Sequence, residues 1–92
     1  MADNVDNMKI GSEGKRNWLY VGDLKNGKRN GKGKMVWSHG AKYEGHFKED
    51  MRDGMGTYYH STGGKYEGNW ANDMKNGKGV YIYPGSGEKY EG

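Results

Sequence analysis

The side chains that could carry out catalysis recur with a regular period. Glu44, Glu67 and Glu91 each follow a tyrosine, at intervals of 23 and 24 residues. A catalytic acid–base pair is expected once in a chain and not once in every repeat. The four serines all fall in expected turns, with no recurrent histidine or acid to activate them: Ser12, Ser38, Ser61 and Ser86. Because an activated nucleophile needs such a base, we expect no catalytic residue and no enzymatic activity.

Histidines and a glycine-rich stretch are the remaining candidates for a metal or phosphate site. His46 and His60 fall on opposite faces of the strands predicted below, and His39 lies in a predicted turn, so the clustering that a metal requires is missing. Residues 22–29 have the spacing of a phosphate-binding P-loop, but they lack the Ser or Thr after the lysine and no helix is expected to follow. The chain has no cysteine. We therefore predict no metal site, no disulfide and no cofactor.

A repeated unit of about 23 residues positions these side chains. The stretch Lys-Tyr-Glu-Gly at residues 42–45 recurs at 65–68 and again at 89–92, and a weaker copy opens at Tyr20. A pair of glycines separated by one residue follows each tyrosine in the same place: Gly31 and Gly33, Gly54 and Gly56, Gly77 and Gly79. A fixed period in this range is typical of a repeat architecture.

These motifs resemble the MORN repeat (membrane occupation and recognition nexus), which begins Tyr-Glu-Gly, has an aromatic residue two positions later and carries a paired Gly-x-Gly. The resemblance covers residues 20–92. Its departures are Val21 for the usual Glu, Leu24 for the aromatic, and one extra residue within 84–87. The resemblance implies a single-layer curved sheet of stacked hairpins. It also implies a module of the kind found in ciliary and cytoskeletal scaffolds, in junctional membrane proteins and ahead of lipid-kinase domains.

Within each unit the sequence alternates with a period of two, which predicts strands. Tyr43, Gly45 and Phe47 share one face, and Glu44 and His46 the other. Asn-Gly and Asp-Gly pairs within residues 26–31, 49–54 and 72–77 predict turns. We therefore predict an all-β fold, an open, curved, single-layer antiparallel β-meander of six strands. Rings facing glycines should form an aromatic trough on one face: Tyr20, Trp37, Tyr43, Phe47, Tyr58, Tyr66, Trp70, Tyr81 and Tyr83.

The predicted array spans residues 18–92, with units at 20–42, 43–65 and 66–89 and the start of a fourth at residue 90. Residues 1–17 are either a mobile tail or a degenerate cap, in which residues 8–19 form a hairpin. A chain that stops three residues into a unit indicates a fragment of a longer array. The polar start is wrong for a secretory signal, so we expect a cytoplasmic protein with possible cytoskeletal or membrane association.

Charge is distributed unevenly along the chain. Residues 15–34 carry seven cations and one acid, and the cations are Lys15, Arg16, Lys25, Lys28, Arg29, Lys32 and Lys34. Two interpretations are open: a patch for anionic lipid such as phosphoinositide or phosphatidic acid, or a solvated hairpin tip. Nucleic acid is an unlikely partner, although basic patches with aromatic residues also bind single strands.

The function predicted from these observations is a scaffold for protein–protein interaction, through the aromatic trough or a sheet edge. The alternative is peripheral binding to anionic phospholipid, or the targeting module of a larger enzyme such as a phosphatidylinositol phosphate kinase. We also expect self-association through the C-terminal edge, because residues 78–83 are apolar on both faces and the next hairpin is absent after three residues.

Overall fold

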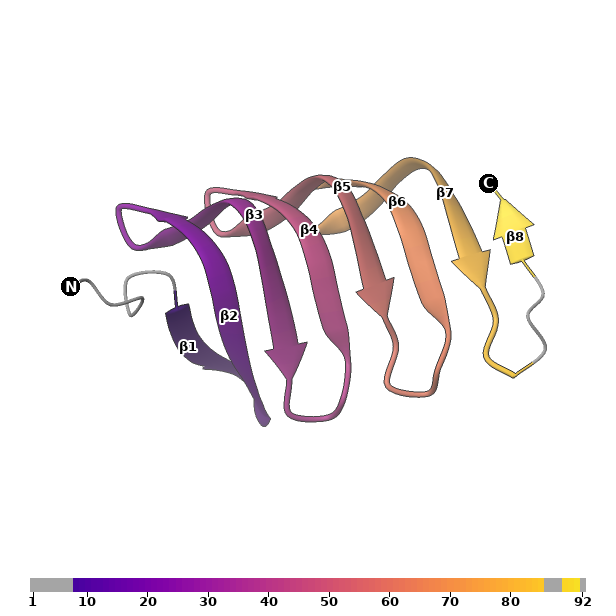
Figure 1. The fold of residues 1–92 in the computed structure, drawn as a ribbon, viewed down its shortest axis with the longest axis horizontal. Helices are drawn as coiled ribbons and strands as arrows, with labels where there is room; N and C mark the ends of the chain where they lie inside the picture. The colour runs from indigo at the N-terminus through magenta and orange to yellow at the C-terminus, as the bar shows by residue number, and fades with distance from the viewer. Residues whose placement is uncertain (1–7, 86–88, 92) are drawn as a thin grey trace.

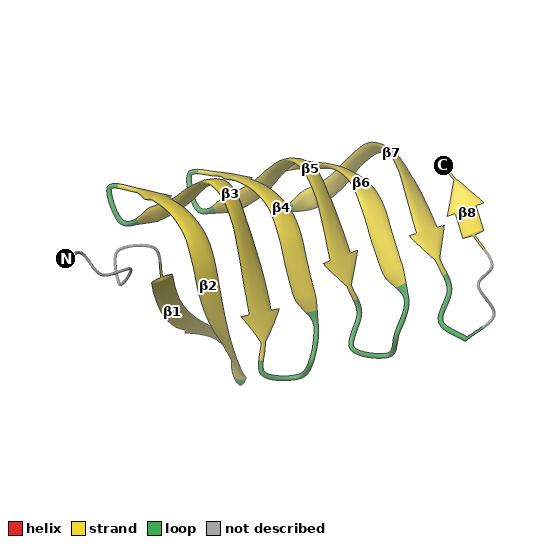
Figure 2. Ribbon diagram, viewed as in Figure 1, coloured by secondary structure: helices red, strands yellow, loops and turns green. Residues whose placement is uncertain are grey.

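The computed structural model describes residues 8–85 and 89–91. Eight strands lie in one sheet in the order of the chain, and every neighbouring pair is antiparallel (Figures 1 and 2). The strands are β1 Met8–Glu13, β2 Arg16–Lys25, β3 Lys28–Trp37, β4 Lys42–Lys48, β5 Met51–Tyr59, β6 Lys65–Ala71, β7 Met74–Ile82 and β8 Lys89–Glu91. The predicted all-β, single-layer meander is confirmed. The described residues include no helix long and apolar enough to cross a membrane.

The pairing register sorts the side chains onto two faces. Tyr43 lies opposite Met35 on β3 and Tyr58 on β5, and because paired residues share a face, these three side chains all point inward. The next row along the strands includes Lys42 and Tyr59, which point outward. We call the side of the rings the inner face and the opposite side the outer face.

The sheet contains three long hairpins, formed by β2 and β3, by β4 and β5, and by β6 and β7. The turns within these hairpins are shorter than the sequence predicted. Only Asn26–Gly27, Glu49–Asp50 and Asn72–Asp73 form them, and all six residues have positive φ. The expectation that the later Asx-Gly pairs also belong to the turns is wrong, because Asn30–Gly31, Asp53–Gly54 and Asn76–Gly77 lie within strands.

The Asx-Gly pairs instead form large β-bulges. Between the pairs Gly22↔Gly33 and Leu24↔Arg29, three residues of β3 face one residue of β2, and Gly31 adopts a φ of 102°. The other two long hairpins have the same register shift. Extra residues on one strand bend it, and each long hairpin curves over near its tip (Figure 1).

Six glycines form a row across the sheet, each directly opposite the next: Gly22, Gly33, Gly45, Gly56, Gly68 and Gly79. A β-carbon added to Gly33 would overlap the Tyr20 ring, and one on Gly56 would overlap the Tyr43 ring. The predicted packing of rings on glycine backbone therefore occurs.

Burial raises the pKa of the Tyr43 hydroxyl to about 12, and this neutral hydroxyl donates a hydrogen bond to the His46 carbonyl at 3.0 Å.

Both ends of the sheet differ from the prediction of six strands. At the N-terminus, residues 8–13 form β1, which pairs with β2 from Met8↔Val21 to Glu13↔Arg16, so the structure shows the hairpin alternative for residues 8–19. The first seven residues of the expected tail lie outside the described part of the chain. At the C-terminus, β8 pairs with residues 80–82 of β7. The premise that this apolar segment is an unpaired edge is therefore wrong.

Candidate binding surface

The nine rings of the predicted trough do not form one open surface. Six of them are buried and make up most of the core: Tyr20, Trp37, Tyr43, Phe47, Tyr66 and Trp70. Five of them contact one another edge to face, for example Tyr43 and Phe47 with ring centroids 5.1 Å apart, and Trp37 packs at a tilt against Tyr58. Tyr58 and Tyr81 are half-buried, and Tyr83 is 44% exposed. Six of the predicted binding residues therefore belong to the core, and the last three keep exposed surface.

Two arginines connect successive hairpins on the inner face. The Nε atom of Arg29 donates to Oδ1 of Asp50 at 2.9 Å, and Nε of Arg52 donates to Oδ1 of Asp73 at 3.0 Å. The backbone amide of each arginine donates to the same carboxylate oxygen at 2.8 Å. We call each of these pairs an inter-hairpin latch, because it fixes the turn of one hairpin to the arm of the preceding hairpin.

The same arginines cover the aromatic core. The guanidinium of Arg29 lies 4.7 Å from the centroid of the Trp18 ring, and that of Arg52 lies 4.6 Å from the Trp70 ring. Lys75 takes the equivalent place in the third unit, 4.9 Å from the Tyr66 ring. Cations over desolvated ring faces stabilise the packing. Sequence reasoning missed this role, although the 23-residue spacing of the two arginines and of their aspartates was a signal for it.

An aromatic groove lies on the C-terminal half of the inner face, and we define it by Tyr58, His60, Tyr81, Tyr83 and Met74. Ring centroids follow one another at 4.8 Å from Tyr58 to His60, 5.5 Å from His60 to Tyr81 and 4.9 Å from Tyr81 to Tyr83. Two shallow hollows of about 300 and 320 Å³ lie along it. Met74, at the rim, is 67% exposed. The groove therefore exposes aromatic rings and a flexible thioether.

His60 carries a polar atom that is buried in this groove without a hydrogen-bond partner among the described residues. Its Nε2 is shielded from solvent and has no hydrogen bond there. Burial, with a smaller contribution from the charge of Lys75, lowers the pKa of His60 below its ordinary value. A neutral imidazole nitrogen without a proton can accept a hydrogen bond, so a ligand that supplies a donor would satisfy it.

The seven cations of the predicted lipid patch are not brought together. Lys15 and Arg16 lie at the opposite end of β2 from Lys25. Three others pair with acids of the second unit, at 3.3, 2.9 and 3.1 Å: Lys28 with Glu49, Arg29 with Asp50, and Lys34 with Glu44. Arg29 points inward and Lys34 outward, so the cations are also divided between the two faces. Lys32 is exposed.

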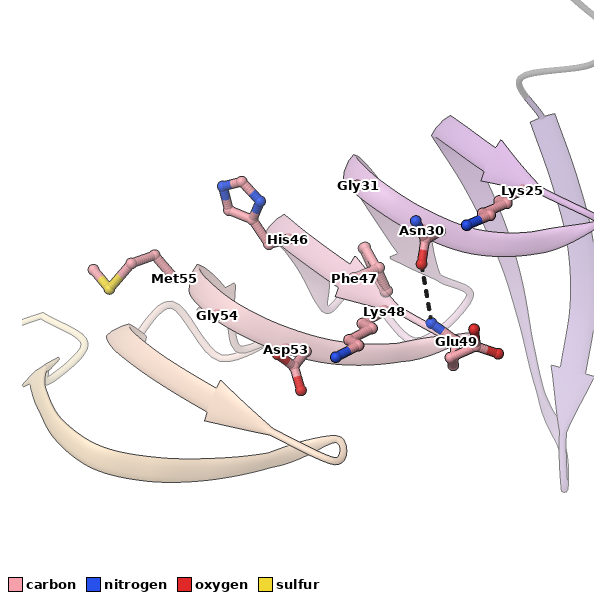
Figure 3. A pocket seen from close by; sticks show the side chains of 10 residues that line it. All are labelled: Lys25, Asn30, Gly31, His46, Phe47, Lys48, Glu49, Asp53, Gly54 and Met55. Atoms are coloured by element: carbon pink, nitrogen blue, oxygen red, sulfur yellow. Dashed lines mark hydrogen bonds between the residues drawn. The ribbon is translucent and has the colours of Figure 1, made fainter.

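A larger hollow of about 580 Å³ lies where the bulges of the first two units face each other (Figure 3). Its charged lining residues are of both signs, with Lys25 and Lys48 beside Glu49 and Asp53. The backbone amide of Glu49 donates to Oδ1 of Asn30 at 3.3 Å across it. No group of three histidine or acidic side chains suited to a metal ion occurs within residues 8–85 and 89–91. The mixture of charges favours no single ligand here.

The sequence profile of the MORN repeat matches three consecutive segments, residues 20–42, 43–65 and 66–88. Each segment covers the bulge, the turn and most of both strands of one long hairpin, so the repeat that the profile detects nearly coincides with the structural unit. A search of curated proteins found no match. Residues 8–19, which contribute β1 and the start of β2, precede the matched segments.

Proposed function

Because this chain belongs to the MORN-repeat family, we propose that it is a non-catalytic module that binds another protein through its aromatic groove. The observation that carries the proposal is a gradient of exposure along the inner face. Trp37 is 8% exposed, and Tyr83, at the equivalent position two units later, is 44% exposed. The groove is thus the part of the ring face that stays accessible among the residues whose side chains the structure describes.

The side chains of the groove are suited to a protein partner. Tyrosine and methionine are enriched at protein interfaces, where they bury a large area and keep a polar tip or a flexible shape. Lys75 lines both hollows beside these rings. A partner segment with apolar side chains, a hydrogen-bond donor for His60 and an acid near Lys75 would fit this surface. A cytoplasmic scaffold of the cytoskeletal or ciliary kind is the narrower form of the proposal, and it rests on the family resemblance.

The proposal can be tested by comparing two variants that remove one tyrosine each. Tyr83→Ser shortens the groove, and the matched control Tyr59→Ser removes a ring from the outer face. We expect the wild type and Tyr59→Ser to retain the same proteins from a cell extract. Tyr83→Ser should lose them. Circular dichroism establishes that both variants fold. A set of retained proteins that is unchanged by Tyr83→Ser would refute the proposal.

Anionic phospholipid is the second candidate, because Lys15, Arg16, Lys25 and Lys32 are exposed and form no ion pair within the described residues. Sedimentation with phosphoinositide vesicles tests it. Binding that weakens with added salt and is lost when Lys25 and Lys32 become Gln would support this candidate. Equal binding by the variant and the wild type would exclude a role for these lysines.

A further inference from the structure

An aliphatic patch covers the outer face at the N-terminal end of the sheet. It consists of side chains that are 36–76% exposed, namely Met8, Ile10, Leu19, Val21 and Val36. The register brings them together, because Met8 lies opposite Val21, and Leu19 lies between Ile10 and Val36. Farther along the same two rows, the outer face carries Glu44, Glu67, Lys42 and Lys65. Tyr59, Val80 and Ile82 also lie in these rows, but they are half-buried. The exposed aliphatic side chains of the outer face are thus concentrated next to β1.

β1 is an edge strand, and within the described residues its only strand partner is β2. Edge strands usually oppose further pairing by means of charges, proline or bulges. The outward side chains of β1 are Met8, Ile10 and Ser12, and it pairs with β2 without a bulge. Its lysine, Lys9, is bound to its own chain, with Nζ donating to the Gly27 carbonyl at 2.7 Å. Ile10, at the open side of the patch, is its most exposed member at 76%.

We propose that β1 pairs antiparallel with β1 of a second copy, with Ile10 opposite Ile10 on a two-fold axis. Directly paired residues share a face, so the outward residues of one copy must lie opposite outward residues of the other. Centring the pair on Ile10 places Met8 opposite Ser12 and Lys9 opposite Gly11. Centring it on Lys9 would place two like charges opposite each other. Centring it on Gly11 would place Ile10 opposite Ser12 and Met8 opposite Gly14, so that no two apolar side chains would lie opposite each other.

This pairing continues the antiparallel order of the whole sheet and joins the two aliphatic patches into one. A second copy is favoured over an anionic membrane, because the residues that prefer a membrane interface, Trp18 and Tyr20, point to the inner face. At the other end of the described sheet, β8 has three residues and offers fewer backbone groups for pairing than the six residues of β1. The dimer uses the end of the sheet opposite to the aromatic groove, so it is independent of the proposed protein-binding function.

Cross-linking gives the first test, because the chain has no cysteine and a single one can be introduced. In the proposed dimer the two copies of Ile10→Cys face each other and should form an intermolecular cross-link on mild oxidation or with a short bis-maleimide. Val36→Cys is the matched control, because it lies in the same patch two strands from the edge. Cross-linking at residue 36 as efficient as at residue 10 would overturn the pairing.

Sedimentation velocity gives the second test. The wild type should sediment as a dimer at high concentration, and Ile10→Lys should be monomeric because two cations would then face each other across the axis. Val36→Lys should remain a dimer. Both positions are exposed, and circular dichroism shows whether the variants keep the fold. A wild type that is monomeric at its highest soluble concentration, or a Val36→Lys that dissociates as fully as Ile10→Lys, would overturn the proposal.

Discussion

At the scale of single residues, the fold depends on tyrosine rings that lie where β-carbons would otherwise be. The first prediction concerns Gly56, where an added β-carbon would overlap the Tyr43 ring. Gly56→Ala should lower the free energy of unfolding by about 1–3 kcal/mol, the usual cost of overpacking a core. Urea denaturation followed by tryptophan fluorescence measures it. Thr57→Ala, one residue away on the outer face, is the control. Equal losses in the two variants would contradict the packing argument.

The second prediction concerns the carboxylate of Asp50. Burial alone would raise the pKa of Asp50, but hydrogen bonds from Arg29 and the charges of Arg29 and Lys9 outweigh it and lower the pKa below its ordinary value. A lowered folded-state pKa gives stability that is present above the unfolded value, about 3.9, and is lost as the pH falls through the folded value.

Denaturation midpoints between pH 7 and pH 2 measure this dependence. Asp50→Asn should be less stable than the wild type at pH 7 and should lose less stability on acidification. Glu67→Gln, which removes one carboxylate from the outer face, is the control for carboxylate number. If Asp50→Asn and the wild type lose stability in parallel as the pH falls, the charge of Asp50 does not contribute as the latch requires.

Sequence alone could predict which face each ring occupies, since a period of two fixes it, but not how far each ring is buried. Exposure depends on the neighbours across the sheet. Met35 is 2% exposed because strands and a latch arginine surround it, whereas Tyr83 lies beyond the end of β7. The period of two therefore predicted the face that the trough residues share, but not that six of the nine rings lie in the core. Arg29 was assigned to a lipid patch for the same reason, because its partner Asp50 belongs to the next unit.

At the scale of elements, the two-residue turns carry the third prediction. Glu49 adopts a φ of 51°, and its equivalent in the third unit, Asn72, also has a φ of 51°. Asparagine tolerates this left-handed region better than glutamate. Glu49→Asn should raise the free energy of unfolding by roughly 0.5 kcal/mol, and Asn72→Glu should lower it by a similar amount. Changes of the same sign in both variants would show that local φ preference does not control these turns.

The hairpins themselves were predictable, but their turns were not fully located. An Asx-Gly pair favours positive φ wherever it stands, and such pairs in one unit can mark either a turn or a bulge. Asn26–Gly27 is a turn, whereas Asn30–Gly31 is a bulge. The distinction depends on the register with the following hairpin, in which Gly31 lies opposite Phe47. That pairing is long-range and has no local signal.

At the scale of the whole molecule, the sheet is a one-dimensional stack. Its principal dimensions are 45, 26 and 25 Å, and the strands pair in the order of the chain. Stability in such an array is approximately a sum of unit and nearest-neighbour terms. The two latches are the same contact at two positions, since Asp50 fixes the second hairpin to the first and Asp73 fixes the third to the second. Breaking either one should therefore have a local effect.

The fourth prediction follows from this matched pair of latches. In Asp50→Ala, Arg29 loses the carboxylate that accepts its hydrogen bonds. The amide protons of β2 and β3 should therefore exchange faster, while those of β6 and β7 should keep their wild-type rates. In Asp73→Ala the acceleration should instead be largest in β6 and β7, because these strands are held to the second hairpin by Arg52. Hydrogen exchange followed by mass spectrometry resolves the two ends, since local openings report local stability. Uniform acceleration along the whole chain in both variants would mean that the 92 residues unfold as one cooperative unit, and the nearest-neighbour description of this array would then be wrong.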